Sequence, residues 1–238
     1  ESLDCAMALQ ELEAMGVENI ITFDAHDPRM MNAIPLTNFD NIMPTYQVLK
    51  TLLKRMPELS FHKDHFMVIS PDEGAIDRNM YFSSVLGCNL GMFYKRRDYT
   101  RVVNGRNPIV AHEYLGESVE GKTVFIADDI IASGESMLEV ARELKKRGAK
   151  HIIANATYPL FTSGFDKFDK AVEEGVLTAV LGTNLTYRNP ELLQRDWYFD
   201  VDCSKYCAYF VAAINHEMSV GSIIDPIKKI EALLASRK

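Results

Sequence analysis

The chain has 238 residues with a formal net charge of −7, and 47% of the residues are hydrophobic while 25% are charged. This length suits one large α/β domain or two small ones, and the negative charge argues against nucleic acid or a membrane surface as the main partner. No run of 18 apolar residues occurs, so we expect no membrane span. Four scattered cysteines without a CxxC pair are typical of free thiols in a reducing cytoplasm.

Helix-like and strand-like segments alternate along the chain. Helices are expected at residues 2–15, 44–56, 76–86, 135–148, 165–175 and 225–236. Strands are expected at residues 19–26, 65–74, 90–96, 122–130, 151–159 and 177–184, and residues 198–218 begin as a strand and continue as a helix. Gly16 and Gly148 are placed to end the helices before them. The alternation predicts a three-layer α/β fold with a mostly parallel sheet flanked by helices.

The first residues carry an apolar stripe at helical spacing and no initiator Met, and the stripe consists of Leu3, Ala6, Met7, Leu9 and Met15. A helix this apolar at the start of a chain leads us to expect an N-terminal truncation. A domain boundary is expected near residues 57–65, which would leave the first part as an incomplete lobe.

Polar side chains gather where three of the expected strands end. Asp24, His26 and Asp27 lie at the end of the first strand segment, Asp72 lies at the end of the next, and Asp128 with Asp129 end the strand at 122–130. Ligands bind beyond the carboxyl ends of the strands in open parallel α/β sheets. These acids are therefore candidates for one binding site.

The loop after the paired acids has the composition of an anion site, and it consists of Ala132, Ser133, Gly134, Glu135 and Ser136. It leads into a helix, whose first N–H groups have no partner within the helix. Two carboxylates beside such a loop would repel a bare phosphate, but they can bind sugar hydroxyls or act through Mg²⁺. A sugar phosphate satisfies both parts. The plainer alternatives are a serine that only caps the helix and an acid that is only solvated. The P-loop and dinucleotide-binding motifs are absent.

The segment at 124–136, "VFIADDIIASGES", resembles the 5-phosphoribosyl 1-diphosphate (PRPP) loop of the type I phosphoribosyltransferase fold. Together with "ENIITFDAHD", "VISPDEG" and "FYKRRD", it makes the chain resemble ribose-phosphate pyrophosphokinase (PRPP synthetase) over nearly its whole length. The resemblance implies three parts: the end of an N-terminal lobe at 1–60, a phosphoribosyltransferase-like domain at 61–205, and C-terminal helices at 206–238 that pack on the lobes.

The resemblance also implies a reaction, in which ATP and ribose 5-phosphate give AMP and PRPP. His26, Asp72 and Asp24 would hold Mg²⁺ on the ATP phosphates. Lys95 and Arg97 would stabilise the transferred diphosphoryl group. The ribose hydroxyls would bind Asp128 and Asp129, and the 5-phosphate would bind residues 132–136. Members of this family assemble as dimers and larger rings, so a homo-oligomer based on dimers, up to a hexamer, is implied.

Two positions of the loop depart from the family pattern, since Ala132 and Glu135 stand where Asp and Gly are common. A carboxylate at 135 should repel a phosphate unless it points away. This departure and the incomplete lobe keep a second function open, a non-catalytic subunit that regulates synthetase partners. A phosphoribosyltransferase that uses PRPP with a base is a third, which the sequence supports less because no base-recognition segment is evident.

Overall fold

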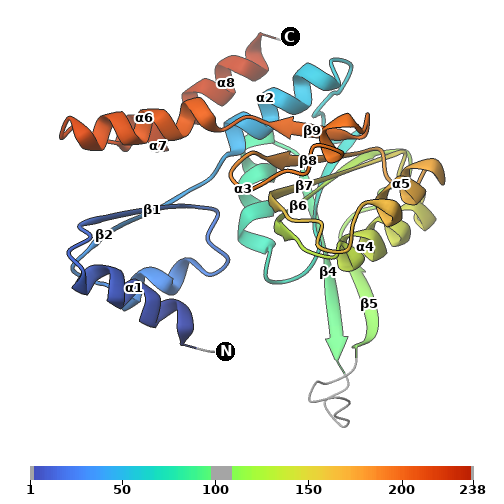
Figure 1. Ribbon diagram of the computed structural model, residues 1–238. Coiled ribbons are helices and arrows are strands. Elements are labelled where there is room, and N and C mark those ends of the chain that lie inside the picture. The colour runs from blue at the N-terminus through green and yellow to red at the C-terminus, as the bar shows by residue number, and fades with distance from the viewer. Residues whose placement is uncertain (1–2, 98–108, 237–238) are drawn as a thin grey trace.

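The computed structural model describes residues 3–97 and 109–236, and a seven-stranded sheet forms its centre (Figure 1). The strand order is β5-β4-β3-β6-β7-β8-β9, and every neighbouring pair is parallel except β4 and β5. The strands are β3 (Phe66–Ser70), β4 (Asn89–Arg97), β5 (Ile109–Leu115), β6 (Thr123–Ile131), β7 (His151–Pro159), β8 (Ala179–Thr183) and β9 (Tyr198–Val201).

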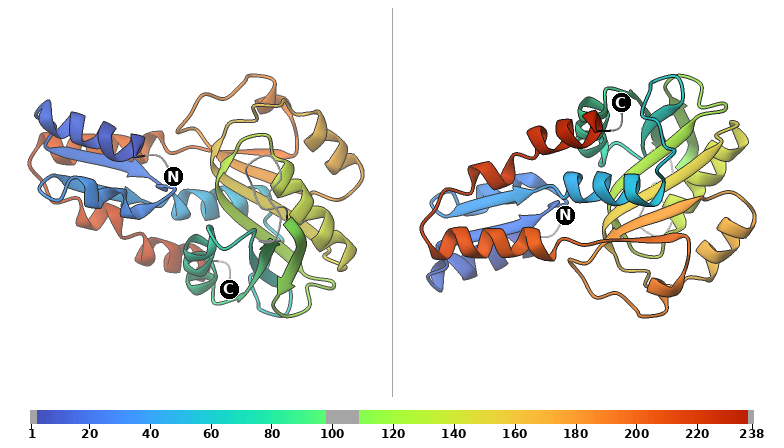
Figure 2. Two further views of the ribbon diagram at one scale, coloured as in Figure 1. Left: turned by 90° about the horizontal axis from the view of Figure 1, so that it is seen from below. Right: turned by 90° about the horizontal axis from the view of Figure 1, so that it is seen from above.

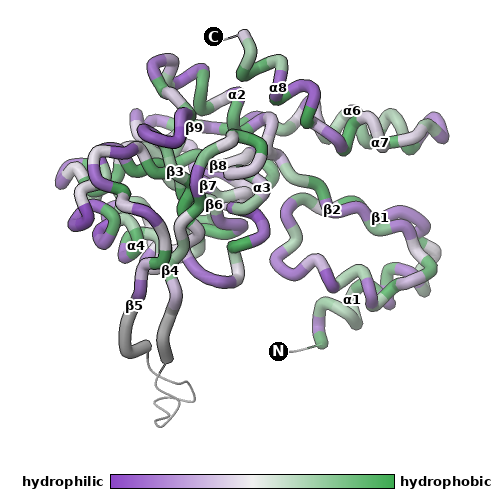
Figure 3. Tube along the Cα trace, turned by 180° about the vertical axis from the view of Figure 1, so that it is seen from behind, coloured by the Kyte–Doolittle hydropathy of each residue, from purple (hydrophilic) through white to green (hydrophobic). Residues whose placement is uncertain are grey.

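Helices cover both faces of this sheet. The helices α4 (Glu135–Lys146) and α5 (Asp166–Glu173) pack on one face, and α2 (Thr45–Arg55), α3 (Ile76–Leu86) and α8 (Ile227–Ala235) pack on the other. A sheet covered on both faces buries its central strands, so they are mostly apolar. The central strands in Figure 3 are accordingly hydrophobic along most of their length, whereas the covering helices alternate in hydropathy.

A smaller unit lies beside the large sheet (Figures 1 and 2). Its two parallel strands, β1 (Asn19–Phe23) and β2 (Asn38–Ile42), lie between α1 (Asp4–Ala14) on one side and α6 (Ser204–Asn215) with α7 (Gly221–Ile224) on the other. Ile42, Tyr206 and Phe210 form its buried centre, and Phe23 meets both rings edge-on. Two short 3₁₀ turns complete the fold, η1 (Pro28–Ala33) and η2 (Leu192–Gln194).

The predicted fold class is confirmed, because the sheet is mostly parallel, helices flank it, and a second small sheet accompanies it. Gly16 and Gly148 follow the ends of α1 and α4 with positive φ, as expected. Two strands were not predicted, β2 and β5. The sequence of β2, "NFDNI", has only two apolar residues, and its pairing with β1 decides its conformation. In the described part of the chain, no helix is long and apolar enough to cross a membrane.

Candidate functional site

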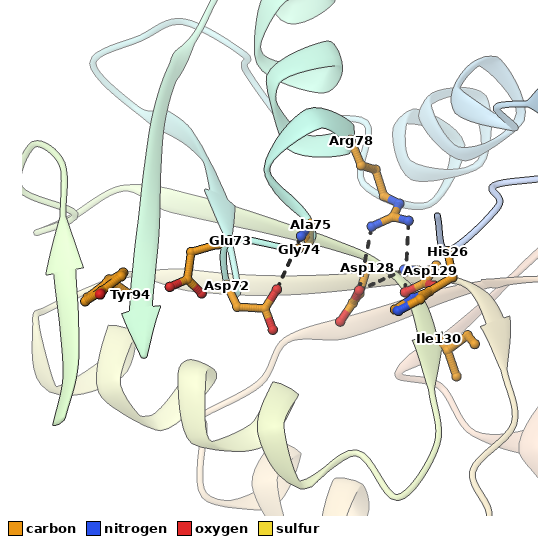
Figure 4. A pocket seen from close by; sticks show the side chains of 10 residues that line it. All are labelled: His26, Asp72, Glu73, Gly74, Ala75, Arg78, Tyr94, Asp128, Asp129 and Ile130. Atoms are coloured by element: carbon orange, nitrogen blue, oxygen red, sulfur yellow. Dashed lines mark hydrogen bonds and ion pairs between the residues drawn. The ribbon is translucent and has the colours of Figure 1, made fainter. Parts of the chain in front are cut away.

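A pocket of about 470 Å³ opens at the carboxyl ends of β3 and β6 (Figure 4). The chain runs from β3 through α3 outward to β4 on one side, and from β6 through α4 to β7 on the other. The strand order thus reverses between β3 and β6, which is where open α/β sheets bind their ligands. The lining residues are His26, Asp72, Glu73, Gly74, Ala75, Arg78, Tyr94, Asp128, Asp129 and Ile130.

Asn79 closes the sheet below this pocket. The ladder between β3 and β6 ends at the pair Ile69 and Ile126, so the next peptide of β6 lacks a strand partner on that side. The buried side chain of Asn79 replaces it: its Oδ1 accepts from the N–H of Ala127 at 3.1 Å, and its Nδ2 donates to the Ala127 carbonyl at 2.8 Å. Because Ala127 directly precedes Asp128, this clamp fixes the start of the acidic pair.

Arg78 lies among three of the acids. Its Nε donates to both oxygens of Asp24 at 2.8 Å and 2.9 Å, and Thr157 on β7 donates to the same carboxylate at 2.6 Å. The other guanidinium nitrogens lie 3.7 Å from Asp128 and 4.0 Å from Asp129. Asp24, one of the predicted metal ligands, is only 3% exposed. Its carboxylate is bound by Arg78 and Thr157. The network joins the small unit to the large sheet.

His26 and the paired acids shift one another's pKa values. The Nδ1 of His26 lies 2.7 Å from Asp129, and this hydrogen bond raises the pKa of the exposed imidazole. Burial opposes ionisation of Asp129, but the hydrogen bonds with Asp128 and His26 and the charge of Arg78 hold its pKa below the usual value. Burial, and then Asp129, raise the pKa of Asp128 to about 7. The pair can therefore present one neutral and one charged carboxyl group to a ligand near neutral pH.

Asp72 lies across the pocket from the paired acids (Figure 4). Its loop is fixed by two hydrogen bonds, from Ser70 Oγ to its carbonyl at 2.7 Å and from the N–H of Ala75 to its Oδ1 at 3.2 Å. Within residues 3–97 and 109–236, no three His, Cys, Asp or Glu side chains are grouped to hold a metal ion. Mg²⁺ in phosphate chemistry is usually bound by one or two carboxylates together with the substrate phosphates. Asp72 suits that manner of binding.

The predicted anion loop forms the turn between β6 and α4. Gly134 adopts φ 78°, and a Cβ at this position would lie 2.3 Å from the ring of Phe168, so glycine is required on both grounds. The N–H of Thr162 holds the Ala132 carbonyl at 2.9 Å. Gly134 and Thr162 thus hold the turn at the N-terminus of α4, where backbone N–H groups attract anions.

Glu135 has an ionic partner in this loop. Its carboxylate lies 2.5 Å from the Nζ of Lys167 on α5, and this contact lowers the pKa of Glu135. The negative charge that the sequence places next to the expected phosphate position is therefore compensated. Ser133 is half-buried and Ser136 is exposed at the same turn.

Lys95 and Arg97 belong to the last part of β4, where their backbone pairs with His112 and Ile109 of β5. Their side chains lie outside the described residues, so their roles stay predictions. Tyr94, the residue before Lys95, lines the pocket. Lys95 and Arg97 therefore come directly after a pocket-lining residue of β4.

Sequence reasoning did not identify four residues that organise this region: Arg78, Asn79, Thr157 and Lys167. The sequence around Arg78, "AIDRNMYF", contains one signal, since an arginine and an asparagine interrupt the apolar face of a helix directly after an Asp-containing loop. Thr157 and Lys167 carry no local signal, because their partners are 133 and 32 residues away in the chain.

Fold and pocket together define an α/β protein with a polar ligand site at the switch point of its sheet. The sequence-family model of the phosphoribosyl transferase domain matches residues 35–167, which is more than half of the chain. The chain therefore belongs to the phosphoribosyl transferase domain family.

Curated relatives make the similarity more specific. A ribose-phosphate pyrophosphokinase from Ralstonia nicotianae is 32% identical over 70% of this chain and 49% of its own length. One from Thermococcus kodakarensis is 30% identical over 77% of this chain and 62% of its own length. The chain thus spans about half to three fifths of the length of these relatives. The predicted resemblance to ribose-phosphate pyrophosphokinases is confirmed.

A solved structure shows the same fold. The crystal structure of phosphoribosylpyrophosphate synthetase from Mycobacterium smegmatis superposes with a TM-score of 0.71 and 19% sequence identity. The match covers 91% of this chain and 65% of that chain. The match therefore leaves out less than a tenth of this chain.

Proposed function

We propose that the chain acts in ribose-phosphate diphosphokinase chemistry, in which ATP and ribose 5-phosphate are converted to AMP and PRPP. The observation that carries this proposal is the arrangement at the end of β6. There Asp128 and Asp129 line the pocket, and the Gly134 turn follows within five residues at the N-terminus of α4. This arrangement supports a ligand that has hydroxyls at one end and a phosphate at the other.

On the ribose side, the roles follow from protonation. A neutral Asp128 can donate to a hydroxyl oxygen, and a charged Asp129 can accept from a hydroxyl. Ala132, Ser133, Gly134, Glu135 and Ser136 would surround the 5-phosphate, which the start of α4 attracts. Lys167 supports this role because it compensates Glu135.

On the ATP side, we propose Mg²⁺ bound by Asp72 with His26, and Asp24 as a residue that acts through Arg78. When bound, Mg²⁺ would neutralise charge on the phosphates of ATP. Lys95 and Arg97 would stabilise the diphosphoryl group during in-line attack by the anomeric oxygen of ribose on the β-phosphorus. The anomeric hydroxyl releases its proton to solvent as the O–P bond forms, the bond from the β-phosphorus to the α,β-bridging oxygen breaks, and AMP leaves.

The test is AMP formation from ATP and ribose 5-phosphate with Mg²⁺. Wild-type protein should form AMP and PRPP in equal amounts, and Lys95→Ala should reduce the rate by about 100-fold or more. A folded protein that binds ribose 5-phosphate but forms no AMP would point to the regulatory subunit. Release of pyrophosphate from PRPP and a base, without ATP, would point to a phosphoribosyltransferase. A folded protein that binds neither substrate overturns the proposal.

The proposal also covers the boundary between the two lobes and the oligomeric state. We place the end of the first lobe before α2 rather than at residue 60, because Val48, Leu49 and Leu52 of α2 pack on the large sheet. Exposed apolar side chains on α1, among them Met7 and Leu12, support a homo-oligomer built from dimers. Sedimentation velocity tests this assembly.

We propose a cytoplasmic location, which fits the free cysteines.

A further inference from the structure

A second pocket, separate from the first, lies between α2, β9, α6 and α8, and we call it the α2–α8 groove. Its volume is about 620 Å³, and it shares no lining residue with the pocket at β3 and β6. Three strand spacings separate β6 from β9 in the sheet, which corresponds to roughly 14 Å. Nothing in the proposed reaction requires this groove, so a ligand of the groove is independent of that reaction.

The groove is basic in a protein that is acidic overall. Five basic side chains line it, two of them one turn apart on α2, and they are Lys50, Lys54, Arg55, Lys205 and Lys229. The chain as a whole has a net charge of −7. Lysines at positions i and i+4 of a helix repel each other by a few tenths of a kcal/mol. An anion bound between them would remove this repulsion.

The ammonium groups of the groove are available to a ligand. Lys50, Lys54 and Lys229 are exposed and form no ion pair with another described residue. Arg55, in contrast, is occupied, since it donates to the Asp196 carbonyl at 3.1 Å and stacks on Phe199. Three lysines from two helices, α2 and α8, can therefore converge on one anionic group.

Both acids of the groove have partners other than its lysines. Asp200 forms an ion pair with Arg188 at 2.5 Å. Asp202 accepts from the N–H of Ser204 at 2.9 Å and from Asn184 at 2.8 Å, and these contacts lower its pKa. Arg188 thus neutralises Asp200, whereas Asp202 stays ionised. Five basic side chains against this one unpaired acid still give the groove a positive field that focuses anions.

We propose that the α2–α8 groove binds the phosphate chain of a small molecule with two or more linked phosphates. Neighbouring lysines on α2 lie about 6 Å apart at Cβ, and several linked phosphates can contact both as well as Lys229 across the groove. The chain can belong to free polyphosphate or to a nucleotide. Tyr46 and Tyr209 also line the groove, and their rings offer a surface on which a base can stack.

The test uses lysine acetylation measured by mass spectrometry, because it reports on each lysine separately. Inorganic tripolyphosphate and ADP are titrated against the protein as the two probes. Lys50, Lys54 and Lys229 should become protected, whereas Lys145 and Lys150, which are exposed on and after α4, should not. Protection by ADP at a lower concentration than tripolyphosphate identifies the nucleotide as the preferred source, and the reverse order identifies free polyphosphate.

A matched pair of variants completes the test. Lys50→Ala/Lys54→Ala should weaken binding of the better probe by about tenfold or more, because two charged contacts are lost. Lys145→Ala/Lys150→Ala removes the same charge elsewhere and should change the affinity by less than about twofold. Equal protection of all five lysines, equal effects of the two variants, or no protection by either probe overturns the proposal. Since acetylation is read at the groove, failure of the proposed reaction would leave this result unaffected.

Discussion

Arg78 and Asp24 form a buried, two-pronged contact between the two parts of the protein. The Nε of Arg78 lies 2.8 Å and 2.9 Å from the two carboxylate oxygens, and the side chains are 8% and 3% exposed. Asp24 directly follows β1 of the small sheet, and Arg78 lies on α3, a helix that packs on the large sheet. The hydrogen bond from Tyr158 to the Phe23 carbonyl at 2.6 Å strengthens the same junction.

Replacing Arg78 by alanine should therefore destabilise the protein strongly. The change leaves the Asp24 carboxylate buried without its cation, which costs about 3–5 kcal/mol in comparable buried pairs. Urea unfolding measures the loss. Arg142→Ala, an exposed arginine on α4, is the control and should change the free energy of unfolding by less than about 0.5 kcal/mol. If both variants unfold at the wild-type urea concentration, the contact does not hold the two parts together.

Asp128 should make stability depend on pH. Its pKa is raised to about 7 in the folded protein, first by burial and then by Asp129, whereas an unfolded Asp titrates near about 3.9. The folded state holds the extra proton between these values, so stability falls as pH rises from about 4 to about 7. Asp128→Asn should remove this dependence. Its free energy of unfolding relative to that of the wild type should therefore be higher at pH 8 than at pH 5, by on the order of 1–3 kcal/mol. An equal gain at both pH values would contradict the raised pKa.

Gly134 should tolerate no side chain. Alanine there combines a positive φ with a Cβ that meets the Phe168 ring at 2.3 Å, and we expect a loss of roughly 2–4 kcal/mol in the free energy of unfolding. Gly164 has nearly the same φ, 76°, with no atom within 4 Å of a Cβ. Gly164→Ala should therefore cost only about 1 kcal/mol. Equal losses in thermal unfolding would mean that the contact with Phe168 is unimportant.

How far the sequence predicted this site depends on the range of the interactions. The acids at the strand ends and the Gly134 turn were predictable because strand, turn and helix follow one another in the chain. The direction of the Asp24 carboxylate was not, since Arg78 and Thr157 reach it only after β1, α3 and β7 have packed together. The strand β5, "IVAHEYL", was missed although Ile109, Val110 and Tyr114 favour a strand, because it follows a basic stretch that was interpreted as irregular.

Glu135 and Lys167 show the same limit within the loop. The sequence reveals an acid next to the expected phosphate, but only the packing of α5 against α4 provides its partner. Under the proposed function, Lys167→Met should weaken ribose 5-phosphate binding by about fivefold because the charge of Glu135 is left uncompensated. Glu135→Gln/Lys167→Met should restore it. Isothermal titration calorimetry measures both affinities, and an unchanged affinity in the single variant would show that Glu135 points away from the phosphate.

Asn79 should control both stability and the position of the acidic pair. Leucine at this site keeps the volume but leaves the Ala127 N–H and carbonyl without partners, which costs roughly 2–4 kcal/mol. Ser84→Ala, on the exposed face of the same helix, should have almost no effect. Hydrogen exchange of the Ala127 amide separates this clamp from a general loss of stability. In Asn79→Leu this amide should exchange at least about tenfold faster than amides in the middle of β6, because it loses its acceptor, the Oδ1 of Asn79. If Ala127 remains as protected as Phe125 and Ile126, the clamp does not hold the end of β6, and the alignment of Asp128 must come from Arg78 and Asp129 instead.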